Sequence, residues 1–151
     1  MKRENASEES RLLVKRLAPP HDGIQAPQKA GDVGYDLVVL EDAVVYPGSA
    51  PIDIPRGFQM KIPDTHFALI VGRSSASRKH HLLVVPAIID SGYTGPIYTP
   101  VYNVGKKSVL VTAGMRLAQC VFLPKQLMPI EFVEALPETE RGSSGFGSTG
   151  E

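Results

Sequence analysis

Short apolar runs, each interrupted within a few residues by glycine or proline, make up most of this chain. The 14 glycines and 13 prolines leave no amphipathic pattern long enough for a helix of about twelve residues or more. Many short strands at close spacing are typical of sandwiches, jelly rolls and closed barrels, so the pattern predicts an all-β fold. The expected strands lie at 11–17, 35–40, 43–46, 57–62, 67–71, 82–85, 97–103, 109–112, 117–123 and 130–133. One helical turn is expected at 74–80.

The stretch from Val84 to Asn103 holds two apolar runs on either side of a short polar turn, DSGYTG at 90–95. This spacing predicts a β-hairpin, because a turn of a few residues with glycine commonly joins two antiparallel strands. The turn sets Asp90 beside Tyr93. Asp90 either serves only to start the turn, by accepting backbone N–H groups, or is a functional carboxylate. The stretch alone leaves both readings open.

Length and composition predict one domain without a leader. The chain has 151 residues, 42% of them hydrophobic, and its 16 basic and 16 acidic residues cancel to a formal charge of +0. No broad basic field is therefore expected for nucleic acid or a membrane surface. The polar first ten residues are expected to be disordered, and no apolar run approaches about 18 residues. These features predict a soluble protein of the cytoplasm, with a nuclear or virus-encoded intracellular protein also possible.

The cysteine and histidine content excludes two common kinds of site. Cys120 is the single cysteine, so the chain can form neither an internal disulfide nor a thiolate zinc cluster. The four histidines show no metal-ligand spacing.

Two polar stretches lie near predicted strands in the first half of the chain. In AGDVGYDL at 30–37, Asp36 enters an apolar strand, which ordinary strand entry also explains. In GRSSASR at 72–78, serines open the predicted helical turn beside two arginines. A helix start offers free N–H donors to an anion, although plain serine capping explains the serines equally well.

Two more polar stretches lie in the second half. Gln119 stands inside the apolar run LAQCVFL, where a buried amide needs partners and a structural cross-strand bond would supply them. The sequence RGSSGFGSTG at 141–150 has the composition of a flexible tail. It also places an arginine, an aromatic ring and hydroxyls among glycines whose backbone can approach a ligand closely.

Taken in order, these five stretches resemble the five motifs of the trimeric dUTPases, which hydrolyse dUTP to dUMP and pyrophosphate. The resemblance runs from about residue 30 to 150, and its most specific parts are AIIDSGYTG and RGSSGFGSTG. It implies a distorted β jelly roll or barrel at 11–136 and a homotrimer with shared active sites. It also implies that an arm at 137–151 closes over the site of a neighbouring subunit.

The resemblance also implies a role for individual residues. Asp90 would activate the water that attacks the α-phosphorus, and Tyr93 would pack against the deoxyribose where a 2′-hydroxyl would lie. Asp36 would hold Mg²⁺ through water. The backbone of the 90–95 turn would read the uracil edge, and Phe146 would stack on the base. The substrate-binding positions implied in addition to Tyr93 and Phe146 are Arg73, Ser74, Ser75, Gly92, Gln119, Arg141, Gly147, Ser148 and Thr149.

The sequence departs from the family at three places. Gly72 replaces a usual proline, SAS at 75–77 replaces Gly-Leu-Ala, and Thr94 replaces a common arginine. GRSSASR, IDSGYTG and AGMRLAQ also resemble dCTP deaminases, and Arg78 matches the second arginine of that family. The deaminase glutamate that shuttles protons falls on Pro100, which cannot transfer a proton, so dUTP hydrolysis is favoured. A dCTP deaminase-like enzyme and a catalytically silent nucleotide-binding relative are the alternatives.

Overall fold

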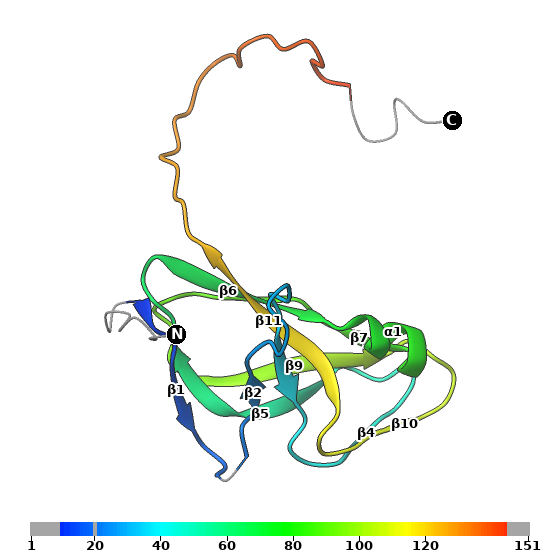
Figure 1. Ribbon diagram of the computed structural model, residues 1–151. Coiled ribbons are helices and arrows are strands. Elements are labelled where there is room, and N and C mark those ends of the chain that lie inside the picture. Colours follow the sequence, from blue (N-terminus) through cyan, green and yellow to red (C-terminus); the bar gives the residue numbers. More distant parts are fainter. Residues whose placement is uncertain (1–9, 20, 145–151) are drawn as a thin grey trace.

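The computed structural model describes residues 10–19 and 21–144 (Figure 1). The regular structure of this part of the chain consists of short strands and one short helix, as predicted. The strands are β1 Leu13–Arg16, β2 Ile24–Gln25, β3 Tyr35–Val38, β4 Ala43–Val45, β5 Ile52–Lys61, β6 His66–Gly72, β7 Leu82–Val84, β8 Ala87–Ile89, β9 Pro96–Asn103, β10 Val109–Val111 and β11 Arg116–Pro124. The helix α1 spans Ser74–His80, the range predicted for it. No helix within the described ranges is long and apolar enough to cross a membrane.

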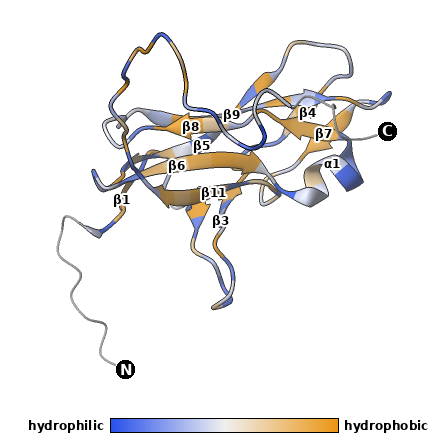
Figure 2. Ribbon diagram, turned by 90° about the horizontal axis from the view of Figure 1, so that it is seen from above, coloured by the Kyte–Doolittle hydropathy of each residue, from blue (hydrophilic) through white to orange (hydrophobic). Residues whose placement is uncertain are grey.

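Two sheets and a strand pair form the body. One sheet has the order β1-β5-β9-β7, the other has the order β2-β3-β11-β6-β8, and β4 pairs with β10. Every pairing between these strands is antiparallel. The strands carry most of the apolar colour in Figure 2, whereas α1 ends in polar colour.

The core lies where the alternating side chains of both sheets point inward. In β5, every second side chain from Ile54 to Met60 is buried, Phe58 among them. This is the period of a strand with one solvated face. Buried residues of the other sheet, including Ile70 and Leu117, belong to the same apolar cluster. The all-β prediction is thus confirmed in the described residues.

Several strand boundaries differ from the prediction. β5 begins at Ile52 rather than at 57, because Pro55 and Gly57 lie inside the strand instead of ending it. Gly57 has φ +69, and the register with β9 shifts between Pro55 and Gln59, so the strand absorbs both residues as an irregularity. The predicted strand at 130–133 is wrong, since this segment has no regular structure. The two-residue β2 was not predicted.

The simple hairpin predicted for 84–103 is also wrong. β8 pairs with β6 in one sheet, whereas β9 lies between β5 and β7 in the other. The antiparallel partner of β9 within this stretch is β7, with Val84 opposite Val101. Because β9 is an inner strand, Pro100 lies in the interior of the sheet and not on an edge strand, where prolines are usually found. Its carbonyl accepts a hydrogen bond from the Val85 N–H at 2.9 Å.

A guanidinium group lies inside the core. Arg56 is 0% exposed, and its Nε donates to Thr99 Oγ1 at 2.9 Å while Nη1 donates to the Leu37 carbonyl at 3.3 Å. Arg56 Nη2 also donates to Thr99 Oγ1. Burial lowers the pKa of Arg56 to about 10, so the group stays charged at neutral pH and depends on these neutral acceptors.

We expect Thr99→Val to destabilise the protein, because the substitution keeps the shape of the side chain but removes the acceptor shared by two Arg56 donors. Donors left unpaired in the core should cost about 1–3 kcal/mol of unfolding free energy. Urea unfolding at one fixed protein concentration measures the change. Thr112→Val is the matched control, because the Thr112 hydroxyl makes no hydrogen bond with another described residue. Equal midpoints for the two variants would contradict the role given to Thr99.

Candidate active site

Three of the predicted site residues meet where β3, β11 and the end of β6 lie side by side. Gln119 of β11 stands opposite Asp36 of β3 on one side and opposite Val71 of β6 on the other. Arg73 follows β6 directly, and its backbone N–H donates to the Leu117 carbonyl at 2.8 Å. The antiparallel register therefore brings Asp36, Arg73 and Gln119 to one place although they are far apart in sequence.

The carboxylate of Asp36 sits between two guanidinium groups. Its Oδ1 lies 3.1 Å from Arg73 Nη1, and its Oδ2 lies 3.6 Å from Arg116 Nη1. These residues line a cleft of about 410 Å³ together with Gln119, Asp32 and the loop before β3. Two guanidinium groups and an amide beside the carboxylates of Asp36 and Asp32 suit an anionic ligand that carries a cation with it.

Gly34 makes room for the amide of Gln119. A Cβ atom at position 34 would lie 2.2 Å from Gln119 Oε1, so any larger residue would push the amide out of place. Gly34 thus has a steric reason, whereas a Cβ atom at Gly31 would meet nothing within 4 Å. The amide is half-buried and faces the same cleft as Arg73.

The start of α1 does not use a serine cap. The N-cap residue is Arg73, with φ −78 and ψ 152, and it makes no side-chain capping bond. Ser77 Oγ donates to the Ser74 carbonyl at 3.3 Å, so that serine bonds within the helix. Ser74 is exposed and Ser75 is half-buried. The capping explanation of these serines is therefore not supported by the geometry.

The Asp90 turn has a defined shape. The Tyr93 N–H donates to the Asp90 carbonyl at 3.1 Å, and the Tyr93 hydroxyl donates to the Pro96 carbonyl at 2.9 Å. A Cβ atom at Gly95 would lie 2.5 Å from Tyr93 Oη, so Gly95 lets the ring fold back over the turn. Gly92 is exposed at the tip of the turn. The tyrosine is thereby fixed at both its backbone and its hydroxyl.

The side chain of Asp90 does not build this turn. Its backbone carbonyl accepts the turn's hydrogen bond, while its carboxylate has no hydrogen-bond or ion-pair partner among residues 10–19 and 21–144. The residue is exposed. A carboxylate that the fold does not use remains available to a ligand, which favours the functional reading over the turn-starting one.

The two groups of residues lie at opposite ends of β6. Ile89 pairs with Ala68, so Asp90 stands level with Phe67, whereas Arg73 follows the other end of the strand. Positions 67 and 73 are six residues apart, which corresponds to about 20 Å along an extended strand. One copy of the chain therefore does not bring Asp90 and Tyr93 to the Asp36 cleft.

The chain after β11 leaves the sheets and runs away from the body (Figure 1). All of its residues from 125 to 144 are exposed. Arg141 contacts neither group of site residues, and its Nε donates to the Ser144 carbonyl at 2.8 Å. The predicted positions Phe146, Gly147, Ser148 and Thr149 lie outside the described residues.

Arg116 is a site residue that sequence reasoning missed. It lies at the start of β11, within the AGMRLAQ stretch, and is one of the two guanidinium partners of Asp36. Residues three apart on a regular strand point to opposite faces, so the spacing from Gln119 gave no signal. The register with β3 shifts between Arg116 and Ala118, and Arg116 and Gln119 line the same cleft.

Cys120 is a core residue. It is 0% exposed, and burial raises the pKa of its thiol to about 12. A thiol that stays protonated and buried is not a nucleophile at neutral pH.

Comparison with known proteins agrees with this geometry. The family model described as dUTPase matches residues 23–150. A deoxyuridine 5′-triphosphate nucleotidohydrolase of Gloeothece citriformis is 40% identical over 121 residues, which cover 79% of this chain and 83% of that protein. A relative of the same name from Pseudomonas fluorescens is 39% identical over 147 residues, which cover 91% and 97%. The solved structure of the Staphylococcus bacteriophage 80alpha dUTPase with dUPNHPP has a TM-score of 0.85 at 26% identity and covers 93% and 99% of the two chains. The predicted fold is thereby confirmed.

Proposed function

This chain belongs to the dUTPase family, and from that premise we propose that it hydrolyses dUTP to dUMP and pyrophosphate, with Asp90 activating the attacking water. The observation that carries the role of Asp90 is its exposed carboxylate, which has no hydrogen-bond or ion-pair partner in the described part of the chain, on a turn closed by Tyr93. A carboxylate in this position accepts a proton from water as the oxygen attacks the α-phosphorus. The P–O bond to the bridging oxygen then breaks, and pyrophosphate leaves.

The cleft around Asp36 is the proposed triphosphate site. Arg73, Arg116 and Gln119 supply positive charge and an amide donor where charge builds up on the phosphate oxygens during transfer. The Asp36–Arg73 pair keeps the guanidinium oriented before the substrate arrives. An oxygen of the triphosphate would then replace the Asp36 carboxylate as the partner of the Arg73 guanidinium.

The residues present fit a magnesium ion that arrives with the nucleotide. No group of three or more His, Cys, Asp or Glu side chains in the described part of the chain could hold a metal by itself. Asp36 offers one partly exposed carboxylate in the cleft, which suits a contact to Mg²⁺ through water while phosphate oxygens supply direct ligands. When bound, Mg²⁺ would neutralise phosphate charge and let the Asp90 carboxylate and the water approach.

A complete site then needs more than one copy of the chain. The separation of about 20 Å between Asp90 and Arg73 supports a site in which one subunit supplies the cleft and another the Asp90 turn. The outer face of the β5-β9-β7 sheet supports an interface, since Tyr98, Tyr102 and Leu83 are 49%, 38% and 50% exposed there. The family resemblance supports a homotrimer, in which Arg141 and the residues after it would close over a neighbouring site.

The segment after β11 also fits an intersubunit arm. Ile130, Phe132 and Leu136 are 82%, 95% and 84% exposed, which is unusual for side chains of this size in a chain with no covering partner. Packing against a second subunit would remove them from water. The arm would then carry the motif at 141–150 to the site of another subunit rather than to the site of its own chain.

The Tyr93 ring is proposed to exclude ribonucleotides. Its hydroxyl is tied to the Pro96 carbonyl and its ring lies against Gly95, so the ring cannot move aside at low cost. A 2′-hydroxyl at the ring would meet a fixed apolar surface. Discrimination between dUTP and UTP would then be steric.

Replacing Asp90 with asparagine tests the proposed base. The change is nearly isosteric, and the Asp90 side chain makes no hydrogen bond or ion pair with the described residues, so assembly and nucleotide binding should persist. Turnover of dUTP should fall by about 10²–10⁴, as expected for loss of a general base. Pyrophosphate release with Mg²⁺ present measures it. A variant that turns over at the wild-type rate would falsify the role of Asp90.

Mixed oligomers test whether sites are shared. Asp90→Asn and Arg73→Gln should each be inactive alone, because each damages a different half of every site. Subunits mixed, unfolded and refolded together should regain about a quarter of wild-type activity, since that share of sites combines an intact Asp90 with an intact Arg73 from another subunit. Sites formed within one chain predict no recovery, and that outcome would exclude the shared arrangement.

The two resembling families predict different products from dCTP. Pro100 has no transferable proton, and its carbonyl is already bonded to the Val85 N–H. We expect dUMP and pyrophosphate from dUTP and no uracil nucleotide from dCTP when the products are separated by chromatography. Formation of dUTP or dUMP from dCTP would require a proton shuttle and would overturn the assignment.

A further inference from the structure

The turn at 90–95 is not supported by a strand ladder of its own. It joins β8 to β9, and these strands lie in different sheets, so no cross-strand hydrogen bonds between them set its position. The Tyr93–Asp90 bond closes the turn locally but does not attach it to the rest of the fold. The ladders reach only the two ends of the turn, where Ile89 pairs with Ala68 and Pro96 pairs with Gln59. The residues between these ends depend on other contacts.

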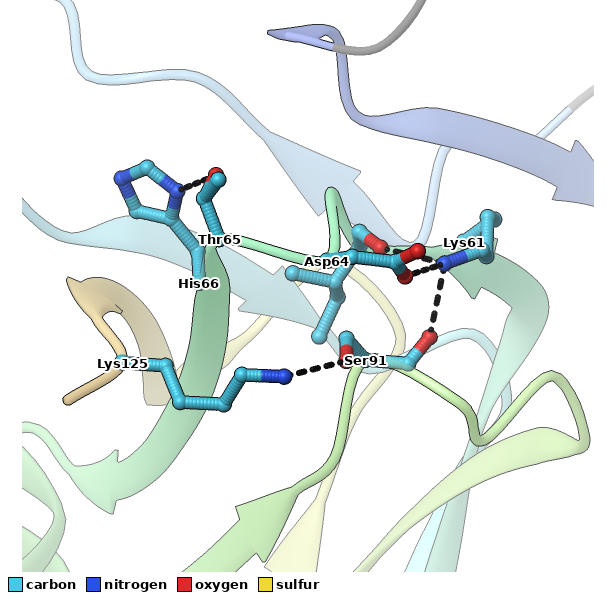
Figure 3. Close-up of polar contacts among 7 residues, drawn as sticks. Lys61, Asp64, Thr65, His66, Ser91 and Lys125 are labelled. Atoms are coloured by element: carbon cyan, nitrogen blue, oxygen red, sulfur yellow. Dashed lines mark hydrogen bonds and ion pairs between the residues drawn. The ribbon is translucent and has the colours of Figure 1, made fainter. Parts of the chain in front are cut away.

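Lys61, the last residue of β5, supplies one attachment. Its Nζ donates to the Ser91 carbonyl at 3.1 Å, to the Ile62 carbonyl at 2.9 Å and to Asp64 Oδ1 at 2.5 Å (Figure 3). An ammonium group has three N–H donors, and here each has an acceptor. The amine is thus fully engaged and directed at the residue that follows Asp90.

Lys125 supplies a second attachment from the other sheet. It follows β11, its backbone N–H donates to the Thr65 carbonyl at 2.9 Å, and its Nζ donates to Ser91 Oγ at 3.4 Å (Figure 3). Ser91 is only 9% exposed, in contrast to its exposed neighbours Asp90 and Gly92. Ser91 is therefore held at its carbonyl from β5 and at its hydroxyl from the end of β11.

Asp64 aligns the amine of Lys61. The hydrogen bond from Lys61 lowers the pKa of the Asp64 carboxyl, the charge of Lys61 adds to this effect, and the charge of Lys125 contributes further. Both lysines therefore act on the same small region, which we call the Ser91 clamp: Lys61, Asp64, Ser91 and Lys125.

We propose that Lys61 and Lys125 are positioning residues that orient Asp90 by fixing Ser91. The inference rests on the proposed function, because it gives the clamp a purpose only if the Asp90 carboxylate must be aimed at a water. Ser91 is the residue after Asp90, and holding its carbonyl and its hydroxyl limits the backbone torsions around it. This limits the directions in which the Asp90 side chain can leave the backbone. Loss of the clamp leaves the carboxylate present but misdirected.

A purely structural role is the competing explanation. The Lys61 and Asp64 side chains are 42% and 85% exposed, and exposed ion pairs contribute little to stability. Removing the Lys61 amine should therefore change turnover far more than it changes the unfolding midpoint. Misplacing a catalytic group by about 1 Å can cost about 100-fold in rate, so small movements of the turn are sufficient.

The first experiment compares Lys61→Met with Lys15→Met. Both variants remove an amine and keep the aliphatic stem, and Lys15 lines the same cavity as Lys61 and Thr94 but makes no hydrogen bond to the turn in the described structure. We expect kcat for dUTP to fall about 10- to 100-fold in Lys61→Met, with a smaller change in KM and an unchanged urea midpoint. Lys61→Arg should recover part of kcat, and Lys15→Met should behave as wild type. Equal kinetics for the two methionine variants would overturn the proposal.

A double-mutant cycle with Asp90→Asn separates positioning from general damage. If Lys61 acts through Asp90, Lys61→Met should cause no further loss of kcat once the carboxylate is gone. A loss of the same factor in both backgrounds would show that Lys61 acts elsewhere. Wild-type turnover of Asp90→Asn alone would instead remove the proposed function, so the two failures are distinguishable.

Lys125→Met keeps the test decisive if Lys61→Met does not fold. This variant removes a single 3.4 Å bond to Ser91 Oγ, from a residue outside the strands. We expect a smaller fall in kcat in the same direction, again absent in the Asp90→Asn background. Unchanged kcat in Lys125→Met would exclude this lysine from positioning.

Discussion

The antiparallel register of β6 with β8 and β11 is the constraint on which the site depends. It places Gln119 beside Val71 at one end of β6 and Ile89 beside Ala68 near the other. Because a strand is nearly inextensible, the distance between the Arg73 cleft and the Asp90 turn is fixed by the number of residues in β6. Side-chain rotation cannot bring the two together, so chemistry that needs both must combine different chains.

The sequence was informative where structure is decided locally. The helix α1 formed at the predicted residues because an apolar strand is followed there by small and hydroxyl-bearing residues. The predicted start of β5 was wrong, because Pro55 and Gly57 are residue types typical of turns yet lie within the strand. The hairpin was wrong for another reason: the partners of β8 and β9 are chosen by burial across two sheets, and spacing along the chain does not encode that choice.

The candidate site also has residues that local sequence predicts and residues that only the strand register reveals. The motifs predicted Asp36, Arg73, Gln119, Asp90 and Tyr93 as site residues, because their residue types and order carry the family resemblance. Arg116 and the lysines of the Ser91 clamp were not predicted, since each acts through a neighbour supplied by register. The segment at 130–133 has the composition of a strand, and its apolar side chains are exposed in this chain alone. In the proposed assembly, these side chains would be covered by another subunit.

The ion pair between Asp36 and Arg73 determines how the cleft can accept a substrate. Both groups are partly exposed, at 24% and 37%, so water screens their attraction and the pair is weak enough to be exchanged. In the proposed reaction, an incoming phosphate with its cation would offer the guanidinium a more highly charged partner and would offer the carboxylate a hydrated metal. Since both groups are partly exposed, this exchange would leave no fully buried charge unpaired, whereas the core position of Arg56 allows no such exchange. Partial exposure would therefore let the same carboxylate orient Arg73 and then release it to the ligand.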